Sequence, residues 1–235
     1  MSKPAPLPLT RKTVFQLFLL VILVPMLPLI LSQHWDRWPG WAFAIIFGGG
    51  FVASRVATAR RHPDLLAERV QGFDHPNMKA WDRPLVTIVA LAIVVIPLVA
   101  GLDLRFGWSE GYEPATATRV AALVVMIAGY WIGTWALIEN RFFSGVVRIQ
   151  TDRGHHVVTS GPYRWVRHPG YVGGILSYLG MPALLGAAWA FAPALIASGV
   201  LVYRTRLEDA TLQDELAGYA EYAQATRWRL LPGLW

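Results

Sequence analysis

The densest group of chemically capable side chains in this sequence lies in residues 160–176, SGPYRWVRHPGYVGGIL. Arg164, Arg167 and His168 supply cations and hydrogen-bond donors, and the Gly-Pro and His-Pro pairs favour turns or extended backbone before a glycine-rich apolar run. An excess of positive charge explains the arginines, but it explains neither the prolines nor the aromatic neighbours. The segment therefore favours a structured loop that binds an anionic or nucleotide-like ligand.

The histidines of the same segment raise the question of a metal site, since His155, His156 and His168 lie close together in the chain. Carboxylates are few nearby, and no pair of ligand residues has the i, i+4 spacing of a helical site. The chain has no cysteine, which excludes thiolate ligands, iron–sulfur clusters and disulfides. We expect no metal.

The tail after residue 203 carries the complementary charge. Arg204 and Glu208 stand at i, i+4 and face the same side of a helix, so Glu208 is the simplest partner for Arg204. An exposed pair of this kind contributes only about 0.3–0.5 kcal/mol and indicates no function by itself. The spacing of apolar residues from 204 onward predicts an amphipathic helix whose apolar face carries Leu212, Leu216, Tyr219 and Ala223.

The elements that must position these side chains are membrane helices. The chain has 235 residues, of which 54% are hydrophobic and 15% charged, and its mean hydropathy is +0.40. The first apolar run is long and lacks a cleavage site, which predicts a retained span and not a signal peptide. Four runs approach the ~20 residues that a helix needs to cross a bilayer, namely 14–31, 39–54, 84–102 and 120–138.

The apolar run from 171 to 203 is too long for one span and too short for two full ones. Glycines and prolines interrupt it, which predicts a short helical hairpin. Only such a hairpin places on one face the four segments that hold 18 of the 21 basic residues, which are 1–12, 55–83, 140–170 and 204–229. Because basic residues accumulate on the cytoplasmic side, both termini are expected there. The basic balance then reflects anionic lipid head groups, and we expect no nucleic acid.

The predicted fold is all-α, a polytopic integral membrane bundle of about six membrane helices, the last two a short hairpin, with a C-terminal amphipathic cytoplasmic helix. Residues 1–139 form the first four membrane helices, and residues 140–235 form the loop, the hairpin and the tail. Gly129 and Gly133 form a GxxxG motif, which predicts close helix approach. The tripeptide Arg61-His62-Pro63 repeats Arg167-His168-Pro169, and we treat the repetition as coincidence.

The sequence GPYRWVRHPGYVGG is followed after the hairpin by Glu208-Asp209, a Tyr219-x-x-Tyr222 pair and a closing LLPGLW. This ordered pattern resembles the isoprenylcysteine carboxyl methyltransferases and their bacterial membrane relatives, which include phospholipid methyltransferases. The specific likeness covers about 140–235, while RHPDLLAERV and KAWDR are similar to the bacterial subgroup. The resemblance implies an S-adenosylmethionine-dependent methyltransferase of the bacterial inner membrane, with residues 140–235 as its methyltransferase core. Its acceptor would be lipid-like or prenylated and modified by carboxyl O-methylation or amine N-methylation.

The resemblance also implies site residues. Arg204 and Glu208 would be the catalytic pair, with Arg204 facing the substrate and Glu208 binding the cofactor. Asp209 replaces the small or apolar neighbour usual in the family, and its role is open. The implied cofactor contacts are Gln150, His155, His156, Val157, Val158, Tyr163, His168, Pro169, Gly170, Tyr171 and Glu208.

Two other functions stay open. Sterol reductase relatives share an RHP-type loop and use a reduced nicotinamide such as NADPH, but residues 206–219 lack the Arg-Asp, Cys and Lys-Tyr-Gly elements typical of them. A non-catalytic lipid-binding or partner-binding membrane protein is the second alternative. Stoichiometric binding of S-adenosylmethionine, with or without turnover, separates the three. The identity of the acceptor and the oligomeric state stay open.

Overall fold

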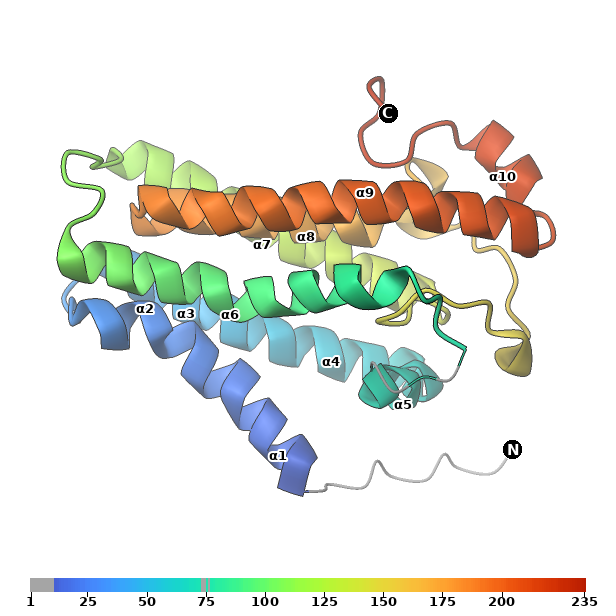
Figure 1. Ribbon diagram of the computed structural model, residues 1–235, viewed down its shortest axis with the longest axis horizontal. Coiled ribbons are helices and arrows are strands. Elements are labelled where there is room, and N and C mark those ends of the chain that lie inside the picture. The colour runs from blue at the N-terminus through green and yellow to red at the C-terminus, as the bar shows by residue number, and fades with distance from the viewer. Residues whose placement is uncertain (1–10, 73–74, 76) are drawn as a thin grey trace.

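The computed structural model describes residues 11–72, 75 and 77–235, and its long helices lie side by side along one axis (Figure 1). The first ten residues, with the predicted cytoplasmic N-terminus, lie outside this part. The first span consists of consecutive helical segments α1 (Arg11–Phe18), η1 (Leu19–Leu23) and α2 (Val24–Ser32). The second span is likewise built from α3 (Trp38–Ala44), η2 (Ile45–Gly49) and α4 (Gly50–Arg61).

The short helix α5 (Pro63–Gln71) separates the second span from the long helices α6 (Asp82–Phe106) and α7 (Thr116–Glu139). A loop with two short turns, η4 (Thr151–Arg153) and η5 (Gly161–Arg164), leads from α7 to α8 (Pro169–Leu185). The turn η6 (Ala188–Ala190) connects α8 to α9 (Phe191–Glu215), and the short α10 (Tyr219–Ala225) follows.

The polytopic all-α bundle is confirmed. Five described helices are long and apolar enough to cross a membrane, namely Val14–Ser32, Trp38–Arg61, Asp82–Phe106, Thr116–Glu139 and Ala188–Glu215. The sixth predicted helix is α8, which has 17 residues and is therefore only about 25 Å long at 1.5 Å per residue. It packs between α7 and α9 within the bundle.

The hairpin of 171–203 is present, but its second arm is not short. Gly186 ends α8 with a left-handed backbone, φ +76°, which reverses the chain at little cost because glycine has no Cβ. Pro193 falls in the first turn of α9, where its missing N–H breaks no helical hydrogen bond. As a result α9 continues unbroken for 25 residues, well past residue 203.

The predicted amphipathic helix from 204 onward is wrong as a single element. The chain leaves α9 at Leu216, and Gly218, with φ +81°, starts α10 in a new direction. The apolar residues of the predicted face nevertheless meet, because Leu212, Leu216, Tyr219 and Ala223 share one cluster with Val157, Val158 and Tyr163. Periodicity therefore identified the buried residues, while the glycine decided where the helix breaks.

The predicted close approach at the GxxxG motif is confirmed between α7 and α8. A Cβ added to Gly173 of α8 would lie 2.5 Å from the carbonyl oxygen of Gly129, and one added to Gly129 would lie 2.7 Å from that of Gly173. Such distances leave room only for hydrogen at both positions. This close contact between Gly129 and Gly173 fixes α8 against α7 and so sets the position of the loop that joins the two helices.

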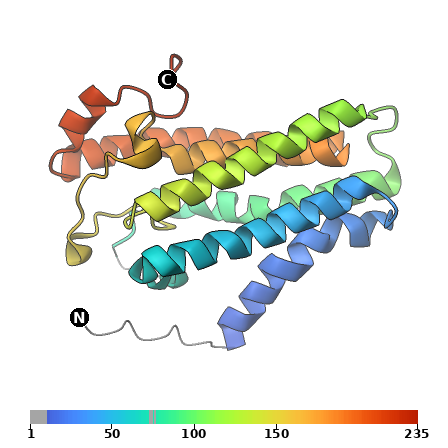
Figure 2. The same cartoon turned by 180° about the vertical axis from the view of Figure 1, so that it is seen from behind.

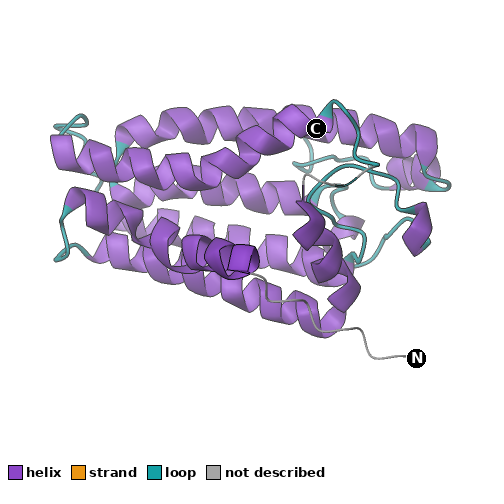
Figure 3. Cartoon of the chain, turned by 60° about the horizontal axis from the view of Figure 1, so that its bottom comes forward, coloured by secondary structure: helices purple, strands orange, loops and turns teal. Residues whose placement is uncertain are grey.

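The connections divide between the two ends of the bundle. Three short connections, α2 to α3, α6 to α7 and α8 to α9, lie at one end (Figures 1 and 2). The other end holds α5, the loop 140–168 and the tail after α9, and most irregular backbone gathers there (Figure 3). The loop and the tail expected to share a site are therefore on the same side.

Candidate functional site

The loop 140–168 is held by hydrogen bonds of its own side chains. Gln150 is buried, its amide nitrogen donates to the carbonyl oxygen of Phe142 over 2.6 Å, and its amide oxygen accepts from Arg153. The amide nitrogen and the amide oxygen of Gln150, a predicted cofactor contact, are thus both hydrogen-bonded within the loop. The rings of His155 and His156 pack against Phe142, with centroids 4.7 and 4.8 Å away.

His155 is a neutral donor at physiological pH. Burial, and then the charges of His156, Arg148 and Arg153, lower the pKa of His155 to about 4. Its Nδ1 lies 3.3 Å from the backbone nitrogen of Gln150 and accepts that hydrogen, so the ring proton resides on Nε2. A neutral imidazole with one free N–H suits recognition of a hydrogen-bond acceptor on a ligand.

The second half of the loop is joined to the tail through backbone hydrogen bonds. The nitrogens of Arg167 and His168 donate to the carbonyl oxygens of Trp228 and Arg229, at 2.9 and 3.0 Å. The hydroxyl of Tyr222 donates to the carbonyl oxygen of Tyr163 over 2.7 Å. These bonds explain why two segments about 60 residues apart in sequence form one wall.

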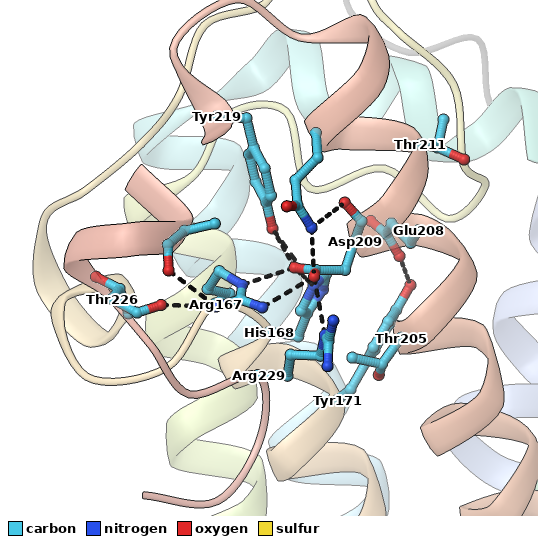
Figure 4. A network of polar contacts seen from close by, with 12 residues as sticks. Arg167, His168, Tyr171, Thr205, Glu208, Asp209, Thr211, Tyr219, Thr226 and Arg229 are labelled. Carbon is cyan, nitrogen blue, oxygen red and sulfur yellow. Dashed lines mark hydrogen bonds and ion pairs between the residues drawn. The ribbon is translucent and has the colours of Figure 1, made fainter. Parts of the chain in front are cut away.

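Asp209, whose role the sequence left open, is the ionic centre of this junction (Figure 4). It is fully buried and binds Arg167 through both carboxylate oxygens, at 2.6 and 2.9 Å. Arg229 donates to it over 2.9 Å and the hydroxyl of Tyr219 over 3.0 Å, and the Nε2 of His168 lies 3.4 Å away. Loop, α9, α10 and the terminal segment therefore converge on one carboxylate.

Glu208 and Arg204 point toward the other side of α9. The hydroxyl of Tyr171 donates to Glu208, which is half-buried. Arg204 does not pair with Glu208 as expected. It forms a two-pronged contact with Asp82 at the start of α6, at 2.6 and 2.9 Å, and both side chains are buried.

Arg204 meets Asp82 because α6 packs against α9 and brings the start of α6 next to Arg204. Its Oδ2 also accepts the backbone hydrogen of Val147 over 2.7 Å, so the same carboxylate ties α6, α9 and the loop together. Both oxygens of Asp82 meet the planar guanidinium, whereas one oxygen of Glu208 is engaged by the hydroxyl of Tyr171. Sequence reasoning missed Asp82, since no local pattern relates it to Arg204.

A pocket lies between the loop and the tail, and we call it the loop–tail pocket. Its empty volume, with the open solvent at its mouth included, is about 740 Å³. Of the twelve predicted site residues only Pro169, which starts α8, does not line it. The residues that do are Gln150, His155, His156, Val157, Val158, Tyr163, His168, Gly170, Tyr171, Arg204 and Glu208.

The chemistry of the pocket is mixed. Tyr163, Tyr219 and Tyr222 give it aromatic faces, and Val157 and Val158 give it an apolar wall. Glu208 is its acidic group, whereas Arg167 and Arg204 are neutralised by Asp209 and Asp82. Such a site accommodates a ligand that combines a flat ring, hydroxyl or ammonium donors, and an acceptor that faces the loop.

Comparison with known proteins identifies a related family. Residues 121–214 match the model of the isoprenylcysteine carboxyl methyltransferase (ICMT) family. The match runs from α7 through the loop and hairpin to α9, so it starts earlier than the likeness at 140–235 and ends before α10.

Curated relatives agree with the family match. The protein-S-isoprenylcysteine O-methyltransferase of Schizosaccharomyces pombe is 35% identical over 69 residues, which are 29% of each chain. A probable protein-S-isoprenylcysteine O-methyltransferase of Oryza sativa subsp. indica is 38% identical over 64 residues, 27% of this chain and 34% of the relative. The match spans about a third of the length of these relatives. Over residues 121–214, the part that carries the loop, the hairpin and Asp209, the resemblance of this membrane protein to the isoprenylcysteine carboxyl methyltransferase family is confirmed.

Proposed function

We propose that this protein is an integral membrane methyltransferase that uses S-adenosylmethionine to methylate the carboxylate of a lipid-like or prenylated acceptor. The observation that carries the proposal is the loop–tail pocket, formed within and beside the family-matched segment by residues of the loop, α8, α9 and α10. The names of the matched relatives favour a carboxyl O-methylation over an amine N-methylation.

The side chains of the pocket fit this cofactor by chemical type. Glu208 supplies an acceptor for an ammonium group or ribose hydroxyls, and the Nε2–H of His155 supplies a donor for a carboxylate. The tyrosines and Val157 offer faces for the adenine ring. Tyr171 holds the Glu208 carboxylate in place through its hydroxyl hydrogen bond.

The proposed reaction requires alignment of the acceptor with the methyl group more than it requires acid–base catalysis. When bound, S-adenosylmethionine supplies a methyl group on a sulfonium whose sulfur leaves with the bonding electron pair. An acceptor carboxylate is already ionised at neutral pH, so its oxygen forms the new C–O bond without losing a proton. The residues around the pocket then have to hold the acceptor in line and exclude water. The buried Arg204–Asp82 and Arg167–Asp209 pairs make that framework rigid.

Calorimetry on the full-length protein in detergent tests the proposal. S-Adenosylmethionine should bind stoichiometrically, and Glu208→Gln should weaken it at least tenfold, because the acceptor for its donors loses its charge. Glu221→Gln is the control, since Glu221 is an exposed acidic residue of α10 outside the pocket. Binding of NADPH with no binding of S-adenosylmethionine would favour the reductase alternative, and binding of neither would contradict the proposal.

A further inference from the structure

A second cavity lies among the membrane helices, and we call it the membrane cavity. Its empty volume, with the open solvent at its mouth included, is about 1000 Å³. Its lining is predominantly apolar, with Leu20, Phe51 and Ile93 from the first spans and α6. Gly133 of α7 also lines it, and no atom lies within 4 Å of a Cβ added to Gly133.

The membrane cavity adjoins the loop–tail pocket. Phe143 and Gly170 line both spaces. A Cβ at Gly170 would lie 2.2 Å from the Phe143 ring, so the glycine allows the ring to lie directly against α8. One aromatic side chain and one glycine therefore form part of the boundary between an apolar space and a polar one.

The first span contributes Leu20 to the lining of the membrane cavity. Leu20 lies in η1, just beyond the part of α1 that diverges from the other helices (Figures 1 and 2). Phe15 and Phe18 of α1 are more than half exposed. The first span thus adds apolar surface to the cavity lining and, in α1, apolar side chains that the rest of the bundle leaves exposed.

Two arginines line this apolar cavity without a carboxylate partner. Arg55 stacks on the Phe51 ring, and its Nη1 is buried without a hydrogen-bond acceptor in the described part of the chain. Arg69 donates to the carbonyl oxygen of Phe143 over 2.9 Å. Neither forms an ion pair with an Asp or Glu of the described residues, whereas Glu68, the neighbour of Arg69, pairs with Arg148.

Two neighbouring cations that have no carboxylate partner among the described residues are unfavourable. Burial, followed by the charges of Arg55 and Arg204, lowers the pKa of Arg69 to about 9. A guanidinium away from water is costly unless an anion neutralises it, and its planar fork fits a carboxylate through two hydrogen bonds. The lining therefore combines a site for a hydrocarbon chain with a site for one anion.

We propose that Arg55 and Arg69 bind the carboxylate of a single-chain lipid whose hydrocarbon chain occupies the membrane cavity. Within the proposed function, on which this assignment rests, that lipid is the methyl acceptor, and its carboxylate lies beside Phe143 toward the loop–tail pocket. Arg204, which the family resemblance suggests for this role, has its fork engaged by Asp82. The two arginines belong to α4 and α5, outside the family-matched segment, so they would distinguish this chain's acceptor.

Spin-labelled stearic acid and its methyl ester test the assignment with the full-length protein in phosphatidylcholine nanodiscs. The immobilised fraction of each probe is measured by electron spin resonance, without any methyl donor. Wild type should retain the acid at least tenfold more tightly than the ester. Arg55→Gln and Arg69→Gln should each remove most of that preference, and Arg61→Gln, an exposed arginine of the same region that lines neither space, should not.

A cavity-filling variant keeps the test decisive if the glutamine variants fold poorly. Gly133→Leu directs its side chain into open space and should reduce retention of the acid and of the ester alike. Equal retention of acid and ester by wild type would overturn the assignment, as would unchanged retention of both probes by Gly133→Leu. Calorimetry with S-adenosylmethionine on the same samples reports separately on the proposed function, because it requires neither arginine.

Discussion

The arginines at the loop–tail junction and those in the membrane cavity differ in what neutralises them. Arg167 and Arg204 are buried, and each forms a two-pronged contact with a buried carboxylate. Arg55 and Arg69 line an apolar space and have no carboxylate partner in the described residues. Where the fold supplies the anion, an arginine holds elements together, and where it does not, the arginine remains available for a ligand.

The pairing with Asp82 also bears on Arg204, for which the family resemblance implies a substrate contact. A cation next to a cofactor site suggests a substrate contact until its partner is known. Once Asp82 occupies the guanidinium, a substrate carboxylate has to compete with an anion that is covalently part of the protein. Arg55 and Arg69 in the membrane cavity have no such competing carboxylate among the described residues.

The largest effect is expected from removing Asp209, the carboxylate that neutralises the arginines of the loop–tail junction. Asp209→Ala leaves Arg167 and Arg229 buried or half-buried without their anion. Breaking a buried pair in this way costs about 3–5 kcal/mol of the free energy of unfolding. Chemical denaturation in detergent measures it, with Asp214→Ala, an exposed aspartate of the same helix, as the control. Equal stability of both variants would remove Asp209 from its structural role.

A double-mutant cycle sharpens the comparison at Arg204. Arg204→Met should cost about 3 kcal/mol of the free energy of unfolding because Asp82 is left buried without its cation. Adding Asp82→Leu should restore part of this loss, since an apolar pair needs no neutralisation but leaves the backbone N–H of Val147 without its acceptor. If Arg204→Met instead keeps wild-type stability and raises only the KM for the acceptor, Arg204 belongs with the ligand-binding arginines.

Gly173 of α8 and Gly133 of α7 test the difference between the close contact of these two helices and the open space of the membrane cavity. Gly173→Ala places a Cβ 2.5 Å from the carbonyl oxygen of Gly129, so we expect about 1–3 kcal/mol of overpacking cost in the free energy of unfolding. Gly133→Ala meets no atom within 4 Å and should change stability far less. Thermal unfolding compares the two, and a larger loss at Gly133 would contradict the packing of α7 against α8.

The smallest effect is expected from protonation of His155. Its pKa of about 4 in the fold lies below the ordinary ~6.5, so the unfolded chain binds this proton first as pH falls. The stability contributed by neutral His155 is complete above about pH 6.5 and declines toward pH 4. The melting temperature of wild type should therefore fall more between pH 7 and pH 5 than that of His155→Gln. Identical falls would show that His155 does not contribute.

Much of the fold was predictable because its signals are local. Hydropathy identified the spans, the interrupting glycines and prolines identified the hairpin, and the GxxxG motif identified the seam at Gly129 and Gly173. The prolines also explain why the two Arg-His-Pro tripeptides begin helices. His62 and His168 have similar backbone angles, φ −137° and −126°, before a proline at the first helical position. Their surroundings differ, since His62 contacts the carbonyl oxygen of Ile138 and His168 lies near Asp209.

By itself the sequence determined that this is a helical membrane protein whose loop and tail carry the polar side chains of a site. Only the tertiary structure decided which charges meet. Asp82 and Arg204 are 122 positions apart, and Arg167 and Asp209 are 42 apart. No periodic pattern connects such positions, because ion pairing depends on distances of a few ångströms that exist only after the helices pack. The same packing leaves Arg55 and Arg69 beside an apolar cavity, with no carboxylate partner among the residues that the structure describes. The order of charges along the chain does not distinguish these two arginines from the others.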